Sequence, residues 1–344
     1  MKKIIGIIAA LAMITGTAYA ADWNFYGSAR VATFVTDIDS TDNTSFDESL
    51  QGNSRIGAKV KVSDSLTGGF EYGTGVNVRK LYGEWNFGAG TLLVGQTYTP
   101  MNIFYSNQVF GGDNDLLPQG GIYSGRKAML RLKFGGFEIA AVDPQDKKDI
   151  AGATAAATTE VNLPGIEVAY TTKFNNIGIF LTAGYNSYEL TDTGVSEVDV
   201  DTWIVGGGAK ADFGPAYLSG NVYVGQNAGH MIGVKTGGTD VATWDGGYAK
   251  LSGGKLVDND VMGFILVAGY KLNNMFTLEA GYGYVETEFD ESGADEDEAA
   301  SYYIQSTITL APGVYVIPEI GVLDGEETAD DKTTYYGAKW QINF

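Results

Sequence analysis

Basic residues at alternate positions are the side chains of this sequence best suited to do chemistry. Between residues 53 and 63, Arg55, Lys59 and Lys61 share one parity, and the apolar Ile56 and Val60 share the other. Successive side chains of a strand point to opposite faces, so such a stretch carries a charged face and an apolar face. A row of fixed positive charges attracts small anions without breaking any bond. The basic residues of the candidate wall strands are Arg30, Arg55, Lys59, Lys61, Arg79, Arg126, Lys127, Arg131 and Lys133.

Residues for bond-making chemistry are scarce. His230 is the only histidine and begins a glycine-rich stretch, which disfavours a hydrolase with a histidine base. The chain has no cysteine, so disulfides and thiolate metal sites are excluded. Residues 295–298 are all acidic but lack the interleaved spacing and the glycine of a calcium loop. We therefore predict no enzyme activity, no metal site, no cofactor and no nucleic-acid partner.

The last eleven residues, 334–344, must form a strand if these charges belong to a sheet. They alternate strictly, with Tyr336, Trp340 and Phe344 on one face and Lys339 on the other. A soluble edge strand could alternate in the same way. The pattern by itself therefore leaves a soluble strand and a membrane strand open.

The amino-terminus indicates that the protein is exported to the cell envelope. Lys2 and Lys3 precede an apolar run over 4–14, and Ala18-Tyr-Ala20 supplies the small residues of a cleavage site. This arrangement is typical of a signal peptide, which we expect over 1–20. The run is too short to span the bilayer as a helix, and no later run reaches the length that a spanning helix needs. If the chain enters a membrane, it does so as strands.

Composition and turn signals predict many short strands. The chain has 48 glycines, 21 tyrosines, 16 phenylalanines and 7 prolines, and a mean hydropathy of −0.05. Tight turns rich in Gly, Asn and Pro alternate with long polar connections, as short and long loops do in a membrane barrel. The count is sixteen, with a weak break near residue 80. The expected strands are 22–36, 53–63, 68–79, 80–88, 91–98, 126–135, 136–142, 165–175, 176–189, 201–213, 215–226, 260–273, 275–287, 301–311, 313–323 and 334–344.

A soluble sandwich with a charged exterior is the alternative reading of these alternating strands. It explains neither the signal peptide nor the aromatic residues near the strand ends, which suit the two girdles of a membrane barrel. The expected girdle residues are Trp23, Tyr170, Tyr270, Tyr282 and Trp340.

One long connection, residues 99–125, carries too many apolar residues for a freely solvated loop. It contains Phe110-Gly-Gly-Asp113 and is followed by Arg126, and Tyr82-Gly83, Gly95 and Arg55 come before it. In these motifs the chain resembles the general diffusion porins of Gram-negative outer membranes. The resemblance implies that residues 21–344 form an all-β, transmembrane antiparallel β-barrel of sixteen strands. It also implies that the 99–125 loop folds into the lumen.

The resemblance further implies roles for individual residues. Arg55 and Arg126 match the basic cluster of the barrel wall, although the alternation puts Lys127 rather than Arg126 on the lumen face. Two positions depart from the family pattern, because Gln96 stands where a third wall arginine is expected and Val109 where an acid is. The opposing constriction loop is represented by Phe110, Gly111, Gly112, Asp113 and Asp115.

The implied partners are those of an outer-membrane protein. They are outer-membrane lipid and lipopolysaccharide, the barrel assembly machinery that would recognise Phe344, two further copies in a homotrimer, and small hydrophilic solutes.

Charge is distributed unevenly along the chain. Without residues 1–20 the chain has 20 basic and 42 acidic residues, and the acids gather in the connections near 37–48, 290–298 and 324–331. Acidic vestibules concentrate cations, but their field fades over about 8 Å, so the basic wall should govern the narrowest point. We predict a passive diffusion channel of weak selectivity that admits small anions. The alternatives are a substrate-specific channel and a plugged structural or adhesive barrel.

Overall fold

The computed structural model describes residues 21–39, 43–236, 246–325 and 332–344. The expected signal peptide and part of the acidic stretch near 326–331 lie outside these ranges. The wall strands are β1 (Asp22–Ile38), β3 (Arg55–Lys61), β4 (Leu66–Gly73), β5 (Val78–Asn86), β6 (Thr91–Tyr98), β7 (Arg126–Phe134), β8 (Phe137–Val142), β10 (Gly165–Phe174), β11 (Ile177–Asp192), β12 (Val195–Phe213), β13 (Ala216–Gln226), β16 (Asn259–Lys271), β17 (Phe276–Phe289), β18 (Asp297–Ala311), β19 (Val314–Asp324) and β20 (Lys332–Asn343).

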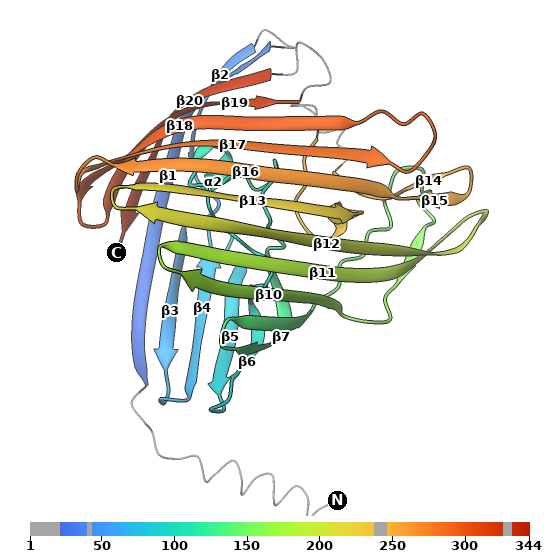
Figure 1. Cartoon of the computed structure of the whole chain (residues 1–344), viewed down its shortest axis with the longest axis horizontal. Coiled ribbons are helices and arrows are strands. Elements are labelled where there is room, and N and C mark those ends of the chain that lie inside the picture. The colour runs from blue at the N-terminus through green and yellow to red at the C-terminus, as the bar shows by residue number, and fades with distance from the viewer. Residues whose placement is uncertain (1–20, 40–42, 237–245, 326–331) are drawn as a thin grey trace, which may run out of the picture.

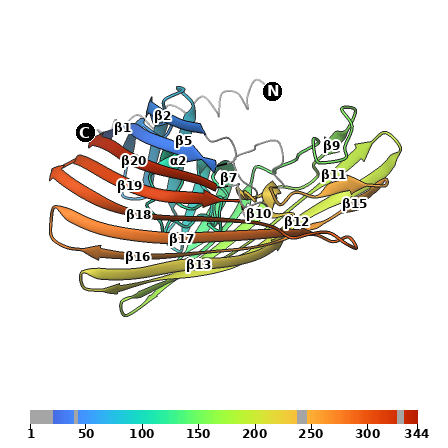
Figure 2. The ribbon, with the colours of Figure 1, turned by 90° about the horizontal axis from the view of Figure 1, so that it is seen from above.

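These sixteen strands close into a barrel. Each pairs antiparallel with its neighbours, and β1 closes the ring by pairing with β20 on one edge and with β3 on the other. In Figure 1, β10 to β18 cross the view nearly horizontally whereas β3 to β7 run steeply, as expected for opposite sides of a tilted barrel. Figure 2 shows the same wall from above. The predicted class and strand number are confirmed.

Shorter strands within the long connections extend the wall at that end of the barrel. β2 (Asn43–Leu50) pairs with the second half of β1, and β9 (Thr158–Glu160) pairs with the end of β11. β14 (Lys250–Ser252) and β15 (Lys255–Val257) form a separate hairpin. The short helices are α2 (Phe110–Asp113) and η2 (Ala228–His230). No helix in the described part of the chain is long and apolar enough to cross a membrane.

The break between the third and fourth predicted strands was misplaced. Thr74 to Asn77 form the turn, with Val76 in the left-handed region at φ 55°, and the next strand begins at Val78. Arg79 therefore belongs to β5 rather than to the strand before it. The apolar alternation alone did not reveal this earlier reversal, although Gly73 and Gly75 are turn signals on either side of Thr74.

The two faces of the wall follow the predicted alternation. In β20, Tyr336 and Trp340 point outward and are about half exposed (51% and 49%), whereas Tyr335 is fully buried inside. All five expected girdle residues are exposed on the outer face. Phe344 lies at the seam with β1, where its backbone exchanges hydrogen bonds with that of Gly27, 2.6 and 3.1 Å long.

Candidate functional site

The segment 99–125 is bound to the inner face of the barrel by three buried glutamates. Glu167 of β10 accepts a hydrogen bond from the backbone N–H of Met101 at 3.0 Å. Glu279 of β17 accepts one from Asn107 at 2.9 Å, and Glu319 of β19 accepts one from Val109 at 2.7 Å. Since buried carboxylates and buried N–H groups are both costly without partners, each bond satisfies two groups at once.

Apolar contacts fix the base of this segment. Ile122 packs in a buried cluster with Met101, Ile204 and Tyr223. The glycines at 206 and 208 of β12 make room for this contact, because a Cβ at Gly206 would lie 2.7 Å from Ile122 Cδ1 and one at Gly208 would lie 2.5 Å from Tyr105 Cε2. These glycines therefore admit side chains of the 99–125 segment against the wall.

The turn at the tip of the segment depends on Phe110-Gly-Gly-Asp113. Gly111, Gly112 and Asp113 all have positive φ, at 64°, 80° and 63°. Consecutive residues in the left-handed region favour glycine, so the backbone of this turn explains the two adjacent glycines of the motif. Phe110 stacks on Tyr335 with the ring centroids 3.8 Å apart, which holds the tip on β20.

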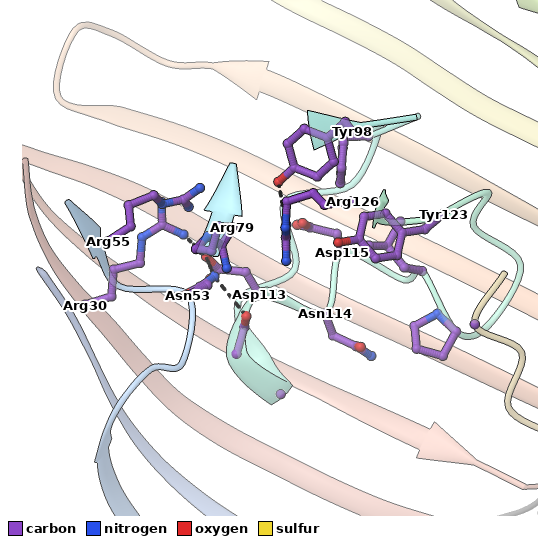
Figure 3. A pocket seen from close by; sticks show the side chains of 16 residues that line it. Arg30, Asn53, Arg55, Arg79, Tyr98, Asp113, Asn114, Asp115, Tyr123 and Arg126 are labelled. Atoms are coloured by element: carbon purple, nitrogen blue, oxygen red, sulfur yellow. Dashed lines mark hydrogen bonds and ion pairs between the residues drawn. The ribbon is translucent and has the colours of Figure 1, made fainter. Parts of the chain in front are cut away.

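Asp113 at this tip is bound to the wall where β1 pairs with β20. Its carboxylate forms ion pairs with Arg30 of β1 and with Lys339 of β20, the latter at 2.8 Å. Asn53 donates a further hydrogen bond at 2.7 Å. Figure 3 shows Arg30, Asn53 and Asp113 converging. The acid of the loop thus anchors the tip, and its charge is compensated by two cations.

A second carboxylate, Glu71 of β4, lies among three cations. Arg79 Nε is 2.8 Å away, Arg55 Nη1 3.7 Å and Lys80 Nζ 3.9 Å. Tyr26 also donates a hydrogen bond to it at 3.0 Å. A register shift between β4 and β5 brings both Arg79 and Lys80 to the inside. Positive charge therefore exceeds negative charge on this wall.

Arg126 forms the far side of the same group. Its guanidinium donates to Tyr98 Oη at 3.1 Å and lies 5.1 Å from the centre of that ring. Within the described ranges, no carboxylate lies at ion-pair distance from it. Lys127 turns instead toward Glu167 at 4.0 Å. Both side chains are therefore inside, and the prediction that only Lys127 faces inward was wrong, because Arg126 is the first residue of β7, where the strand emerges from the loop.

These groups enclose a cavity of about 310 Å³. Four arginines line it, from β1, β3, β5 and β7, and the tip of the 99–125 segment lines the other side (Figure 3). Six cations stand at or beside it against the carboxylates of Glu71 and Asp113. Asp115 adds little negative charge at acidic pH, since burial and the neighbouring Asp113 raise its pKa well above the ordinary range. The cations are Arg30, Arg55, Arg79, Lys80, Arg126 and Lys339.

The remaining predicted basic residues lie elsewhere on the inner wall. Arg131 pairs with Glu84 at 3.4 Å and with Glu138 at 3.2 Å, and Lys133 pairs with Glu138 at 2.7 Å. Lys61 pairs with Asp64 near a short turn, and Lys59 is exposed in the strand before it. None of the four lines the cavity.

Sequence reasoning missed several residues of this site. Lys80 was missed because the predicted turn fell next to it, between residues 79 and 80. Lys339 was visible in principle, since its parity in the last strand is inward, but nothing in the sequence linked it to Asp113. The three glutamates that bind the loop also carry inward parity and no other signal.

Comparison with known proteins gives one family and several similar folds. A model of the Gram-negative porin family matches residues 8–328. Among solved structures, the outer membrane channel DcaP of Acinetobacter baumannii superposes with a TM-score of 0.74 at 15% identity, covering 95% of this chain and 99% of that one.

Two further structures are similar in fold. The anion-selective porin of Comamonas acidovorans superposes with a TM-score of 0.61 at 14% identity, covering 94% of this chain and 100% of the other. A trimer form of OmpT, an outer membrane protein of Vibrio cholerae, gives 0.60 at 14%, covering 94% and 99%. A search of curated proteins finds no match.

Proposed function

This chain belongs to the Gram-negative porin family, and on that premise we propose that it is a passive channel that admits small hydrophilic solutes and prefers small anions to cations. The family and the fold place it in the outer membrane as a channel. The preference for anions goes further and rests on the charges at the cavity between the 99–125 segment and the wall.

The excess of cations over carboxylates at this cavity carries the proposal. Of the three nearby carboxylates, Asp113 is already paired with two cations and Glu71 with three, and Asp115 still leaves the six cations in excess. Arg126 has no carboxylate partner within the described residues, so its charge remains available to a passing ion. In a narrow passage of low dielectric, such fixed charges raise the local concentration of anions.

The acidic connections oppose this preference. They gather carboxylates in the long connections between strands, where salt screens their field within about 8 Å. The paired groups at the cavity lie inside the wall and are screened less. The preference should therefore be moderate and should survive at physiological salt.

We also propose a homotrimer, assembled in lipid and lipopolysaccharide by the barrel assembly machinery with Phe344 as its signal. The trimer form of a protein of similar fold supports the oligomeric state. Chemical cross-linking of the purified protein, followed by mass determination, tests the number of subunits.

Single-channel recording in planar bilayers tests the channel itself. With a tenfold KCl gradient, we expect stable conductance steps and a reversal potential of the sign that anions produce. Arg126→Gln should move this potential toward zero, because it removes the cation without a carboxylate partner. Arg131→Gln is the matched control, since Arg131 is paired with two glutamates away from the cavity. A cation-selective wild type would refute the anion preference, and a folded protein without conductance would favour the plugged barrel.

A further inference from the structure

Residues 227–236, which follow β13, also turn into the barrel. β13 ends at Gln226, and Asn227 follows in the left-handed region at φ 54°, which asparagine tolerates better than most residues. Its side-chain amide donates to Asp201 O at 2.8 Å and to Asp258 Oδ1 at 2.7 Å, and its Oδ1 accepts from the N–H of Asn259 at 2.9 Å. This fully buried side chain therefore fixes the direction in which the chain leaves the wall.

The first turn of this connection is held by a backbone hydrogen bond to its returning part. η2 follows directly, and Gly229 donates its N–H to Gly247 O at 2.9 Å. A Cβ at Gly229 would lie 1.9 Å from Gly246 O, so the two limbs of the connection touch backbone to backbone. Contact this close requires glycine and leaves little freedom to the residues that follow.

The residues after η2 pack against the base of the 99–125 segment. Met231 and Met101 both lie on Gly184 of β11, where a Cβ would be 2.5 Å from Met231 Cε and 3.1 Å from Met101 Cε. Met231, Ile232 and Val234 belong to the same buried cluster as Met101 and Ile122. The two connections thus share one dry core.

A second contact lies near the tip of the 99–125 segment. The backbone N–H of Lys235 donates to Pro118 O at 3.0 Å. Gly233 lines the cavity that the four arginines line from the other side. Residues 110–118 are therefore held at two points, by Asp113 on the arginine side and by Pro118 on the side of this connection.

We propose that residues 227–236 are a second constriction element that holds the 99–125 segment in place and so sets the width of the passage. Asn227, Met231 and the N–H of Lys235 are its positioning groups. The inference rests on the channel proposed above, and it predicts that the passage widens and fluctuates when either contact is removed, while the charges that select ions stay in place.

A pair of variants at one position isolates the contact with Pro118. Lys235→Pro removes the N–H that binds Pro118 O, and Lys235→Ala removes the same side chain but keeps the N–H. Hydrogen exchange of the amides at 116–121 should be about tenfold faster in Lys235→Pro than in Lys235→Ala, since one backbone hydrogen bond is lost. In single-channel records, the open-state noise should rise in Lys235→Pro alone, with the reversal potential unchanged.

A second pair tests the apolar contact without changing the backbone. Met231→Ala should raise the unitary conductance by about half as the segment relaxes away from the cavity. Met275→Ala is the matched control, because Met275 is exposed in the turn after β16, at the other end of this strand from residue 227. If exchange at 116–121, noise and conductance are the same in each variant and its control, the inference is wrong. If the wild type does not conduct, the proposed channel fails, whereas the exchange comparison still decides this inference.

Discussion

The two sides of the lumen handle charge in opposite ways. On the arginine side, formed by β1, β3, β4 and β5 with the start of β7, Glu71 is surrounded by three cations. Asp113 of the loop tip lies between Arg30 of this side and Lys339 of β20. On the covered side, formed by β10 to β13 and β16 to β20, the 99–125 segment lies against the wall. There Glu279 and Glu319 have no cation at ion-pair distance within the described ranges.

Neutral donors take the place of cations at Glu279 and Glu319. Glu279 accepts hydrogen bonds from the backbone and side chain of Asn107, and also from Tyr217, Tyr303 and Gln305. Glu279, which is satisfied by fixed N–H and O–H groups, holds the 99–125 segment, whereas Glu71, which is surrounded by flexible cations, mainly adjusts the field. Glutamate therefore anchors the loop on one side and balances charge on the other.

Removal of the Glu279 carboxylate should have the largest effect on stability. We expect Glu279→Leu to lower the free energy of unfolding by about 3 kcal/mol or more, because it leaves several buried donors without an acceptor. On the arginine side, Glu84→Leu should cost about 1 kcal/mol or less, since Glu84 makes only a partly exposed ion pair with Arg131. Urea unfolding in lipid vesicles, followed by tryptophan fluorescence, measures both. Equal losses would show that the two sides do not differ in this way.

A side chain at the wall glycines that admit the 99–125 segment should lower the free energy of unfolding somewhat less. A Cβ at Gly208 would lie 2.5 Å from Tyr105 and 2.7 Å from Gly220 O, so Gly208→Ala should destabilise the barrel by about 2 kcal/mol. On the arginine side, Gly83→Ala should be nearly neutral, because the nearest atom to its Cβ would be Thr67 O at 3.9 Å. The same unfolding measurement applies. A neutral Gly208→Ala would mean that the 99–125 segment does not press on the wall.

The covered side should also be sensitive to acid through His230. Burial and the charge of Lys147 lower the pKa of His230 to about 3. The unfolded imidazole binds a proton near pH 6.5, so its contribution to stability is complete above that pH and is lost as the pH falls toward 3. The loss is about 1.4 kcal/mol per pH unit in that window.

Two measurements check this titration. The difference in unfolding free energy between wild type and His230→Gln should change with pH from 6.5 to 4. The imidazole NMR signal, which is unique in this chain, should stay that of the neutral form at pH 5. An ordinary titration near pH 6.5 would contradict the burial.

The smallest effect should come from the two acids at the loop tip. At pH 5, Asp113→Asn should shift the reversal potential further in the anion direction, by less than about a twofold change in permeability ratio, because one paired carboxylate is lost. Asp115→Asn should leave the potential nearly unchanged, since the raised pKa of Asp115 favours its neutral form at this pH. Equal shifts in the two variants would show that Asp115 contributes a full charge.

Alternation in the sequence determined the barrel and its faces. In a wall with one apolar side and one polar side, each residue has only two possible directions, so the parity of residues such as Tyr336 and Lys339 can be read along a strand. The same rule predicted the inward direction of Arg30, Arg55 and Arg131. It failed near residue 80, where the turn comes earlier than predicted and a bulge shifts the parity.

Only the tertiary structure decided which inward residues meet. Closure of the ring brings β20 beside β1, so Lys339 and Arg30 bind the same Asp113 although more than 300 residues separate them along the chain. The folding of residues 99–125 and 227–236 into the barrel then decided that Glu279 is a buried anchor and that Arg126 faces a cavity. Local periodicity cannot predict such contacts, because they depend on which strands far apart in the sequence pair with each other and on which segments fill the lumen between them.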